Sequence, residues 1–300
     1  MKHTLKEWVA VTRYWSFPVS AMPVVVTFAY LLSRSLVPCG ALPIVNFVLA
    51  LVGVVILHSA GNVLSDYFDY KTGVDNPEAF AVPNLVFKKF EPKEYLIFSL
   101  VLFAVGIIIG LVLTFLSGWQ LLVLGGMGVA LTAAYSFLKY RALGDIDIFI
   151  IFSVLIMLGT SYVVTGAVVW EVLVLALPVG IITVSVLHAN NTFDIVSDGN
   201  AGMKSFAMLL GGKASSVLYM IYMAIPFVAV VVAVAAGWMS PLALLCLPAA
   251  VPAWKNMSAA SHYDEKGIVT MAGLDQASAK LQLVFSGLLS IGLFIAAALA

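Results

Sequence analysis

Two short segments of the sequence carry amides and carboxylates at helical spacing. Each segment combines one asparagine with two aspartates: Asn62, Asp66 and Asp69 in the first, and Asn190, Asp194 and Asp198 in the second. The intervals are i, i+4 and i+7 in the first set and i, i+4 and i+8 in the second. Residues at these intervals share one face of a helix. We therefore expect each set to project from one side of a helix.

Oxygen-rich sets of this kind suit the binding of a hard divalent cation. Carboxylates three or four residues apart repel each other unless a cation lies between them. Mg²⁺ prefers oxygen ligands and usually keeps substrate phosphates in its coordination shell. We interpret the four aspartates as catalytic residues that bind Mg²⁺ and, through it, a diphosphate. The alternative is that they are solvated loop ends, which two matched sets in a chain with only 10% charged residues argue against.

Basic and aromatic residues near these sets are candidates for binding the same diphosphate. Lys139 and Arg141 end a polar, aromatic segment that includes Tyr135, and Lys204 follows the second acidic set. A single loop lysine more often reflects membrane topology than substrate binding. Lys139 is the strongest candidate because it borders the polar segment at the expected membrane surface. The predicted substrate-binding residues are Asn62, Tyr135, Lys139, Arg141, Asn190 and Lys204.

Two histidines and two cysteines lie within or beside apolar runs. His58 and His188 are within two helical turns of the aspartates. A histidine inside a membrane span is costly, which favours a function, although a hydrogen-bonded helix contact explains it equally well. Cys39 and Cys246 are far apart and form neither a metal pair nor a disulfide framework.

Long apolar runs must position these residues, because 62% of the 300 residues are hydrophobic and the mean hydropathy is +1.08. The 15 basic and 15 acidic residues cancel. This composition excludes a water-soluble fold, a disordered chain and a nucleic-acid-binding protein. A membrane helix needs about 20 apolar residues. We predict an all-α membrane bundle in one domain, 1–300, with nine spans: 16–34, 43–64, 95–117, 119–138, 147–168, 171–190, 215–238, 240–254 and 280–300.

The eighth of these runs is short and contains three prolines, so the alternative number of spans is eight. Asn62–Asp66 and Asn190–Asp194 have the same spacing and are four predicted spans apart, which indicates a duplication of two four-helix halves. Residues 3–15 have the pattern of a helix lying in the membrane interface.

The charges divide between the two faces of the predicted bundle. All of the 15 basic residues except Arg34, and all of the 15 acidic residues except Glu171, fall on one face. The excess of lysine and arginine makes that face cytoplasmic. We expect an integral protein of a bacterial or archaeal cell membrane, with its active site at the cytoplasmic face.

Taken in their order along the chain, the two acidic sets and the polar segment around Lys139 resemble motifs of the UbiA superfamily of intramembrane prenyltransferases. Residues 62–75 are similar to the first acidic motif and look most like the branch that prenylates 1,4-dihydroxy-2-naphthoate on the way to menaquinone. Residues 190–204 resemble the second motif, and residues 135–145 resemble the connection between the fourth and fifth spans. The resemblance covers nearly the whole chain.

The resemblance implies a bundle with a central cavity and acidic motifs that meet at its cytoplasmic mouth. It also implies Mg²⁺, an allylic polyprenyl diphosphate and access from membrane lipid. The four aspartates would hold the metal with help from Asn62 and Asn190, and Lys139 and Lys204 would contact the diphosphate. The acceptor would be an aromatic compound.

Other interpretations stay open at this point. The naphthoate branch usually has arginines after the first motif, whereas this chain has no basic residue between Asp75 and Lys88. The acceptor could therefore be a naphthoate, a benzoate, a porphyrin-like ring or a glycerol lipid. A membrane transporter is the main non-enzymatic alternative, but its ionisable residues should lie near mid-membrane. The motif of phosphatidyl-alcohol transferases is absent from the sequence.

Overall fold

Helices form the whole architecture of the described part of the chain. The computed structural model describes residues 3–74, 83–200 and 202–300, and these residues contain no β-strand. Eight helical segments within them are long and apolar enough to cross a membrane. They are η1 (Tyr14–Ser16) continued by α2 (Pro18–Ser33), α3 (Leu42–Lys71), α5 (Pro92–Ser117), α6 (Leu121–Lys139), α7 (Gly144–Phe149) continued by the π-helix η2 (Ile150–Leu155) and α8 (Ile156–Thr165), η3 (Trp170–Leu175) continued by α9 (Ala176–Phe193), α12 (Gly212–Ala235) and α15 (Leu274–Leu299).

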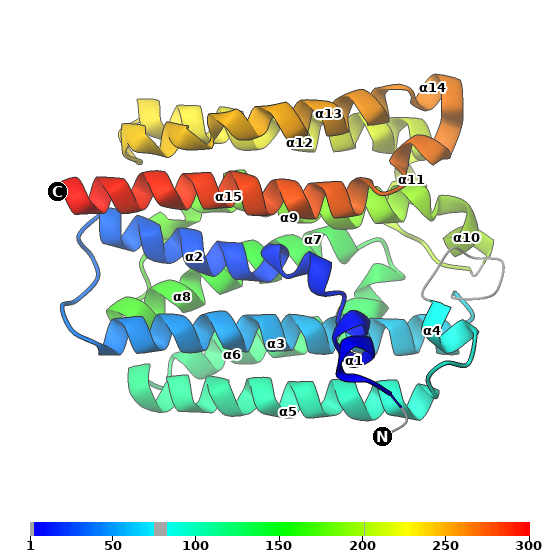
Figure 1. The fold of residues 1–300 in the computed structure, drawn as a ribbon, viewed down its shortest axis with the longest axis horizontal. Coiled ribbons are helices and arrows are strands. Elements are labelled where there is room, and N and C mark those ends of the chain that lie inside the picture. Colours follow the sequence, from blue (N-terminus) through cyan, green and yellow to red (C-terminus); the bar gives the residue numbers. More distant parts are fainter. Residues whose placement is uncertain (1–2, 75–82, 201) are drawn as a thin grey trace.

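Shorter helices connect these segments. They are α1 (Leu5–Val11), α4 (Pro83–Val86), α10 (Ile195–Asn200), α11 (Phe206–Leu210), η4 (Pro241–Ala249), α13 (Ala250–Ser261), α14 (Tyr263–Lys266) and η5 (Gly267–Met271). Figure 1 shows that α4, α10 and α14 lie together at one end of the bundle, opposite the C-terminus.

The predicted span 240–254 does not form a regular membrane helix. Its first part is the 3₁₀ helix η4, which contains Pro241 and Pro248 and leads into α13. Proline lacks an amide hydrogen and cannot complete an α-helical ladder. Figure 1 shows this pair of segments running beside α12. The described residues therefore contain eight candidate spans, which agrees with our alternative number, and the predicted ninth is not confirmed.

The length of α3 explains how the first acidic set reaches the end of the bundle. Its 30 residues span about 45 Å at 1.5 Å per residue, whereas the hydrocarbon core of a bilayer is about 30 Å thick. The helix ends where Gly73 takes a left-handed conformation (φ 79°). Asn62, Asp66 and Asp69 all lie within the continuous helix, as the spacing predicted.

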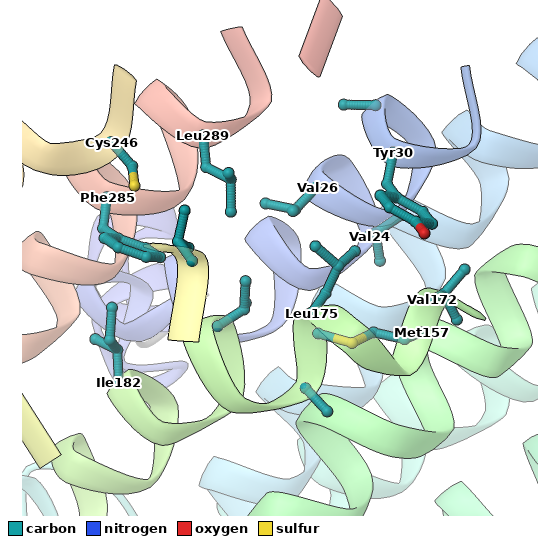
Figure 2. Packing of buried hydrophobic residues seen from close by; sticks show 14 of the residues in the cluster. Val24, Val26, Tyr30, Met157, Val172, Leu175, Ile182, Cys246, Phe285 and Leu289 are labelled. Carbon is teal, nitrogen blue, oxygen red and sulfur yellow. The ribbon is translucent and has the colours of Figure 1, made fainter. Parts of the chain in front are cut away.

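The apolar core joins the N-terminal and C-terminal helices. Figure 2 shows Val24 and Val26 of α2 facing Leu175, beside Phe285 and Leu289 of α15. These side chains are buried, and van der Waals packing of this kind is what holds membrane helices together. The core fixes α2 and α15 against α9, so the end of α9 that carries the second acidic set has a rigid base.

One close helix contact requires glycine. A Cβ atom added to Gly292 of α15 would lie 2.0 Å from the backbone oxygen of Leu242 in η4. Only a residue without a side chain allows this approach, and α15 and η4 pack against each other there. The proline-containing segment η4 therefore packs directly against α15 as part of the bundle.

Candidate active site

The first acidic set lies at the end of α3 among cations and hydroxyl groups. Asp66 is 1% exposed and Asp69 is 4% exposed. The guanidinium of Arg13 donates a hydrogen bond to Asp66 and forms an ion pair with it. Asp69 is paired with the Nζ of Lys139 at 3.3 Å and accepts a hydrogen bond of 2.7 Å from the hydroxyl of Tyr140. Each buried carboxylate of this set is therefore paired, as burial of a charge requires.

The N-terminal segment is held against α3 by Asn62. The amide of Asn62 donates to the backbone oxygen of Thr12 at 3.1 Å and to the hydroxyl of Ser16 at 3.3 Å. Between these two anchors, Arg13 adopts a left-handed backbone (φ 54°), which directs the chain so that its guanidinium reaches Asp66. In this structure the side chain of Asn62 thus contacts the N-terminal segment.

The second acidic set is divided by a break in the helix. We expected Asn190, Asp194 and Asp198 on one continuous helix, but α9 ends at Phe193 and Asp194 is its C-cap residue, after which α10 begins. The amide of Asn190 donates to Asp194 at 2.8 Å. The uniform face predicted from the spacing therefore extends only from Asn190 to the break.

Asp198 is the most unusual group of this set. It is 4% exposed, and its Oδ2 atom is buried without a hydrogen-bond partner in the described part of the chain. Burial raises the pKa of Asp198 to about 7, although the charge of Lys139 opposes this rise. Burial also raises the pKa of Asp194, again against the charge of Lys139. Burial thus outweighs the nearby positive charge at both carboxylates, and Lys139 is a cation whose charge acts on both.

The two sets face a common region but do not meet at one point. Lys139 is paired with Asp69, and its charge also acts on Asp194 and Asp198. Among the residues that the structure describes, no three side chains of His, Cys, Asp or Glu lie close enough to hold a single metal ion. We call the four carboxylates of Asp66, Asp69, Asp194 and Asp198 the acidic mouth. Its carboxylates interact electrostatically, since the charges of Asp194 and Asp69 both act on Asp198.

A cavity of about 110 Å³ lies beside the acidic mouth. Asn62, Tyr135, Lys139 and Asn190 line it, which brings together four of the six predicted substrate-binding residues. The deeper wall includes His58, whose Nδ1 lies 3.0 Å from the hydroxyl of Ser20. The sequence alone did not decide between a functional and a structural role for His58. In the structure, His58 lines the cavity.

Arg141 and Lys204 do not join the cavity. Arg141 is exposed; its guanidinium lies 3.5 Å from the ring centre of Phe137 and donates to the backbone oxygen of that residue. Lys204 is exposed, and neither residue belongs to the cavity wall. The continuation of the first motif to Asp75 lies outside the described residues. The structure thus separates Lys139, which lines the cavity and is paired with Asp69, from Arg141 and Lys204, which do not line the cavity.

Three ionisable residues of the cavity or the acidic mouth were not predicted. Arg13 precedes the first span, Tyr140 adjoins Lys139, and Asp275 lines the cavity from the start of α15. The last predicted span began at 280, which placed Asp275 in a loop. Arg13 and Asp275 are single charged residues next to apolar runs, and this was the sequence signal that could have identified them. Local spacing cannot show that residues so far apart in the chain reach the same site.

His188 has a structural role in the described fold. Its Nδ1 lies 2.9 Å from Asp145, and its Nε2 lies 2.9 Å from the hydroxyl of Ser215. His188 and Ser215 are 0% exposed and Asp145 is 6% exposed. This buried chain of hydrogen bonds joins α7, α9 and α12, so it supports α9 just before the second acidic set.

The fold and the site define an integral membrane protein in which a cavity with polar and apolar walls lies beside the acidic mouth of a helical bundle. The sequence model of the UbiA prenyltransferase family matches residues 21–272. The chain therefore belongs to the UbiA prenyltransferase family and is a membrane-bound prenyltransferase.

Curated relatives of the same family align with most of the chain. The chain is 30% identical over 298 residues to the UbiA prenyltransferase domain-containing protein 1 of Danio rerio, covering 96% of this chain and 84% of the relative. It is 31% identical over 240 residues to the protein of the same name from Mus musculus, with 75% of this chain and 68% of the relative covered.

Solved structures share the fold at lower identity. A UbiA homologue from Aeropyrum pernix K1 superposes with a TM-score of 0.70 at 18% identity, covering 93% of this chain and 97% of that chain. A UbiA homologue from Archaeoglobus fulgidus bound to GPP and Mg²⁺ has a TM-score of 0.69 at 12% identity, covering 97% and 99% of the two chains. These likenesses confirm the helical fold predicted from the sequence.

Proposed function

We propose that this protein transfers a polyprenyl group from an allylic polyprenyl diphosphate to an aromatic acceptor, in a reaction that depends on Mg²⁺. The observation that carries the proposal is Lys139, which is paired with Asp69 of the acidic mouth and also lines the neighbouring cavity, whose wall includes apolar residues. An acidic entrance repels a free diphosphate, so a divalent cation must accompany the anion. The archaeal relative bound to GPP and Mg²⁺ supports the same pairing.

The residues of the mouth fit Mg²⁺ in their chemistry. All four are carboxylates, the hard oxygen donors that this ion prefers. The buried Oδ2 of Asp198 has no hydrogen-bond partner in the described part of the chain. A buried oxygen without a partner needs an explanation, and coordination of a cation supplies one. Asp66 and Asp69 would hold one ion and Asp194 and Asp198 another, and bound Mg²⁺ would supply Lewis-acid neutralisation of the diphosphate.

The basic residues of the site act on the leaving group. Lys139 and Arg13 are the cations paired with the first acidic set. When the carbon–oxygen bond of an allylic diphosphate breaks, negative charge grows on the diphosphate, and positioned cations stabilise that charge. The departing diphosphate takes the bonding electron pair and leaves a resonance-stabilised allylic cation.

The cavity walls protect that cation from water. Tyr135 and Phe152 line the cavity; aromatic faces attract cations, and apolar walls exclude the water that would quench a carbocation. An electron-rich aromatic ring then attacks the terminal carbon of the allylic cation and loses a proton. A naphthoate acceptor that reacts at its carboxylated carbon loses carbon dioxide instead of the ring proton.

We propose 1,4-dihydroxy-2-naphthoate as the acceptor, which would place the reaction in menaquinone biosynthesis. The support is the similarity of residues 62–75 to the first motif of that branch. Residues 1–300 would act as one domain. The basic residues gathered at the mouth support a cytoplasmic active site, and we keep a bacterial or archaeal cell membrane as its expected location.

The test uses purified protein in detergent, a radiolabelled polyprenyl diphosphate and a panel of acceptors that includes a dihydroxynaphthoate, a hydroxybenzoate and a glycerol phosphate. We expect a prenylated naphthoquinol in the presence of Mg²⁺ and none after chelation. The matched control is Glu171→Gln, which removes a carboxylate at the start of η3. Product with only the benzoate or the glycerol acceptor would contradict the naphthoate as acceptor. Absence of product with every acceptor would contradict the prenyl transfer itself.

A further inference from the structure

His58 brings a histidine side chain into the wall of the cavity beside the acidic mouth. It lies on α3 four residues before Asn62 and eight before Asp66, at roughly 6 and 12 Å along the helix axis. Residues at these intervals share one face of a helix. An acceptor that attacks the allylic carbon next to the diphosphate therefore comes beside the stretch of α3 that runs from the acidic mouth to His58.

The hydrogen bonds of Ser20 determine which nitrogen of this imidazole carries the proton. The hydroxyl of Ser20 donates to the backbone oxygen of Phe17 at 3.2 Å, which uses its single hydrogen. The same hydroxyl oxygen lies 3.0 Å from Nδ1 of His58, so it accepts a hydrogen bond from that nitrogen. Nδ1 is therefore the protonated nitrogen of the neutral ring, and Nε2 carries a free electron pair.

Nε2 is the nitrogen of His58 that a ligand can use. Within residues 3–74, 83–200 and 202–300, no group forms a hydrogen bond with Nε2, whereas Nδ1 is engaged by Ser20. The ring of Phe152 meets the imidazole edge to face, with ring centres 5.0 Å apart, and restricts its rotation. His188 shows the contrast, because both of its nitrogens have protein partners and it does not line the cavity.

The other ionisable side chains of the cavity wall are less suited to accept a proton. Arg13 and Lys139 are cations paired with carboxylates, and the phenol of Tyr135 is itself a proton donor. Asp275 has a carboxylate, but its charge acts on the second acidic set, so it lies toward the acidic mouth. His58 is therefore the side chain of this wall best placed to serve as a base.

We propose that Nε2 of His58 is the base that takes the hydroxyl proton of the acceptor during attack on the allylic cation, and that the acceptor is a phenol. The inference rests on the proposed function, which supplies the donor and the cation. A positioned histidine is the most common side chain in such proton transfers.

The proposed step balances without a further reagent. As the ring carbon bonds to the allylic carbon, the electron pair of the O–H bond becomes the second bond of a ring carbonyl, and the proton passes to Nε2. The attacked carbon then releases its hydrogen as a proton to the departed diphosphate, or releases carbon dioxide if it is carboxylated. The electron pair left behind restores the aromatic ring, and the oxygen takes its proton back from the imidazolium of His58.

The experiment removes the base and varies the acidity of the acceptor. His58→Asn deletes Nε2 and keeps an amide that can donate to Ser20, and His58→Gln, which also lacks a base, is the second variant if the first does not fold. Ser20→Ala removes only the partner of Nδ1, and His262→Asn makes the same change at an exposed histidine outside the cavity wall.

Each variant is assayed in detergent with Mg²⁺, one donor and a series of fluorinated dihydroxynaphthoates or hydroxybenzoates, whichever class the wild-type protein prenylates. Fluorine makes the hydroxyl group of the acceptor progressively more acidic. The measured quantity is the kcat/KM of the variant divided by that of the wild type for each acceptor. A loss of folded protein lowers all of these ratios equally, so their trend across the series reports the base.

We expect His58→Asn to lower the ratio by about 100-fold or more for the least acidic acceptor, as loss of a general base does. The loss should shrink as the acceptor becomes more acidic, because an ionised hydroxyl needs no base. Ser20→Ala should lower the ratio by less than about tenfold, the effect of one hydrogen bond, and His262→Asn should keep the wild-type ratios.

Equal ratios for all acceptors in His58→Asn and His58→Gln would overturn the proposal, since a structural defect affects every acceptor alike. Equal losses in His58→Asn and Ser20→Ala would also overturn it, by assigning His58 to the contact between α2 and α3. Transfer by the wild-type protein to glycerol phosphate alone would overturn the phenolic acceptor. Absence of transfer to every acceptor would instead refute the proposed function.

Discussion

Buried charges at the end of α3 are neutralised in pairs. Asp66 is paired with Arg13 and Asp69 with Lys139, and the side chains of both aspartates are almost fully buried. Removing one partner of such a pair leaves an uncompensated charge, which is more costly than replacing both. The cations therefore stabilise the fold as well as the proposed leaving group.

Lys139→Met should lower both stability and activity. The loss of the ammonium leaves Asp69 with only the neutral hydroxyls of Tyr140 and Ser65 among the described residues, and we expect a cost of about 3 kcal/mol in the free energy of unfolding. The transfer rate should fall by about 100-fold, because one cation no longer stabilises the leaving diphosphate. Thermal unfolding in detergent and the transfer assay measure the two effects.

The double variant Lys139→Met with Asp69→Asn separates these effects. It should recover part of the lost stability, since no buried charge stays unpaired, while its activity should stay low. Additive losses of stability in the double variant would show that the two side chains do not act as a pair.

Local spacing predicted some site residues well and others poorly. The four aspartates of the acidic mouth lie at the same end of the bundle, and Tyr135 and Lys139 line the cavity beside them. Arg141 lies outside the cavity wall because its side chain turns back over Phe137 on the surface, and its role in substrate binding stays a prediction. Arg13 was missed because its contact with Asp66 depends on the path of the N-terminal segment, which no helical spacing encodes.

At the scale of elements, the N-terminal segment contributes Arg13 to the site. Helix α1 is only seven residues long and begins with a capping box of Thr4 and Glu7. Leu5 is 81% exposed, which agrees with the interfacial helix that we predicted. The connection from α1 to α2 passes Asn62, so this one amide links an interfacial helix to the acidic mouth.

Asn62→Ala should release this segment from α3. Two hydrogen bonds would be lost, at about 1 kcal/mol each, and Arg13 would lose its fixed position beside Asp66. We expect faster proteolysis within residues 3–16 and a reduced transfer rate. The control is Asn190→Ala, which lies on α9 and should leave the proteolysis of residues 3–16 unchanged. Equal protection of the segment in both variants would contradict this role of Asn62.

Element boundaries were predicted least well where a proline or an interruption of a helix intervenes. The run 240–254 had enough apolar residues to be predicted as a span, but Pro241 and Pro248 favour the 3₁₀ helix η4. The second acidic set looked continuous, yet α9 ends at Phe193. In both cases hydrophobicity and spacing were informative, while the backbone geometry depended on packing that the sequence pattern does not contain.

At the scale of the molecule, charge separates the two ends of the bundle. The acidic mouth and the short helices α4, α10 and α14 lie at one end (Figure 1), and Cys39 is exposed in the segment between α2 and α3. The all-helical fold followed directly from composition and run length, because a chain this apolar has few ways to satisfy its backbone in a membrane. The duplication of two halves stays a prediction.

Thiol labelling of intact cells tests the orientation. A membrane-impermeant maleimide should label the native Cys39 from outside, because the proposed orientation places the α2–α3 segment away from the cytoplasm. The variant Lys204→Cys in a Cys39→Ala background should be labelled only after the membrane is permeabilised; the buried Cys246 should give little background. The reverse pattern would put the acidic mouth on the outer face.

The central claim is that the acidic mouth holds a diphosphate through Mg²⁺. The most direct measurement is the binding of a non-reactive geranyl diphosphate analogue to the purified protein, with and without Mg²⁺, by calorimetry. Our account predicts binding that requires Mg²⁺, is weakened at least about tenfold in both Asp66→Asn and Asp194→Asn, and is unchanged in Glu171→Gln. Equally tight binding in a chelator, or wild-type affinity in both aspartate variants, would contradict it.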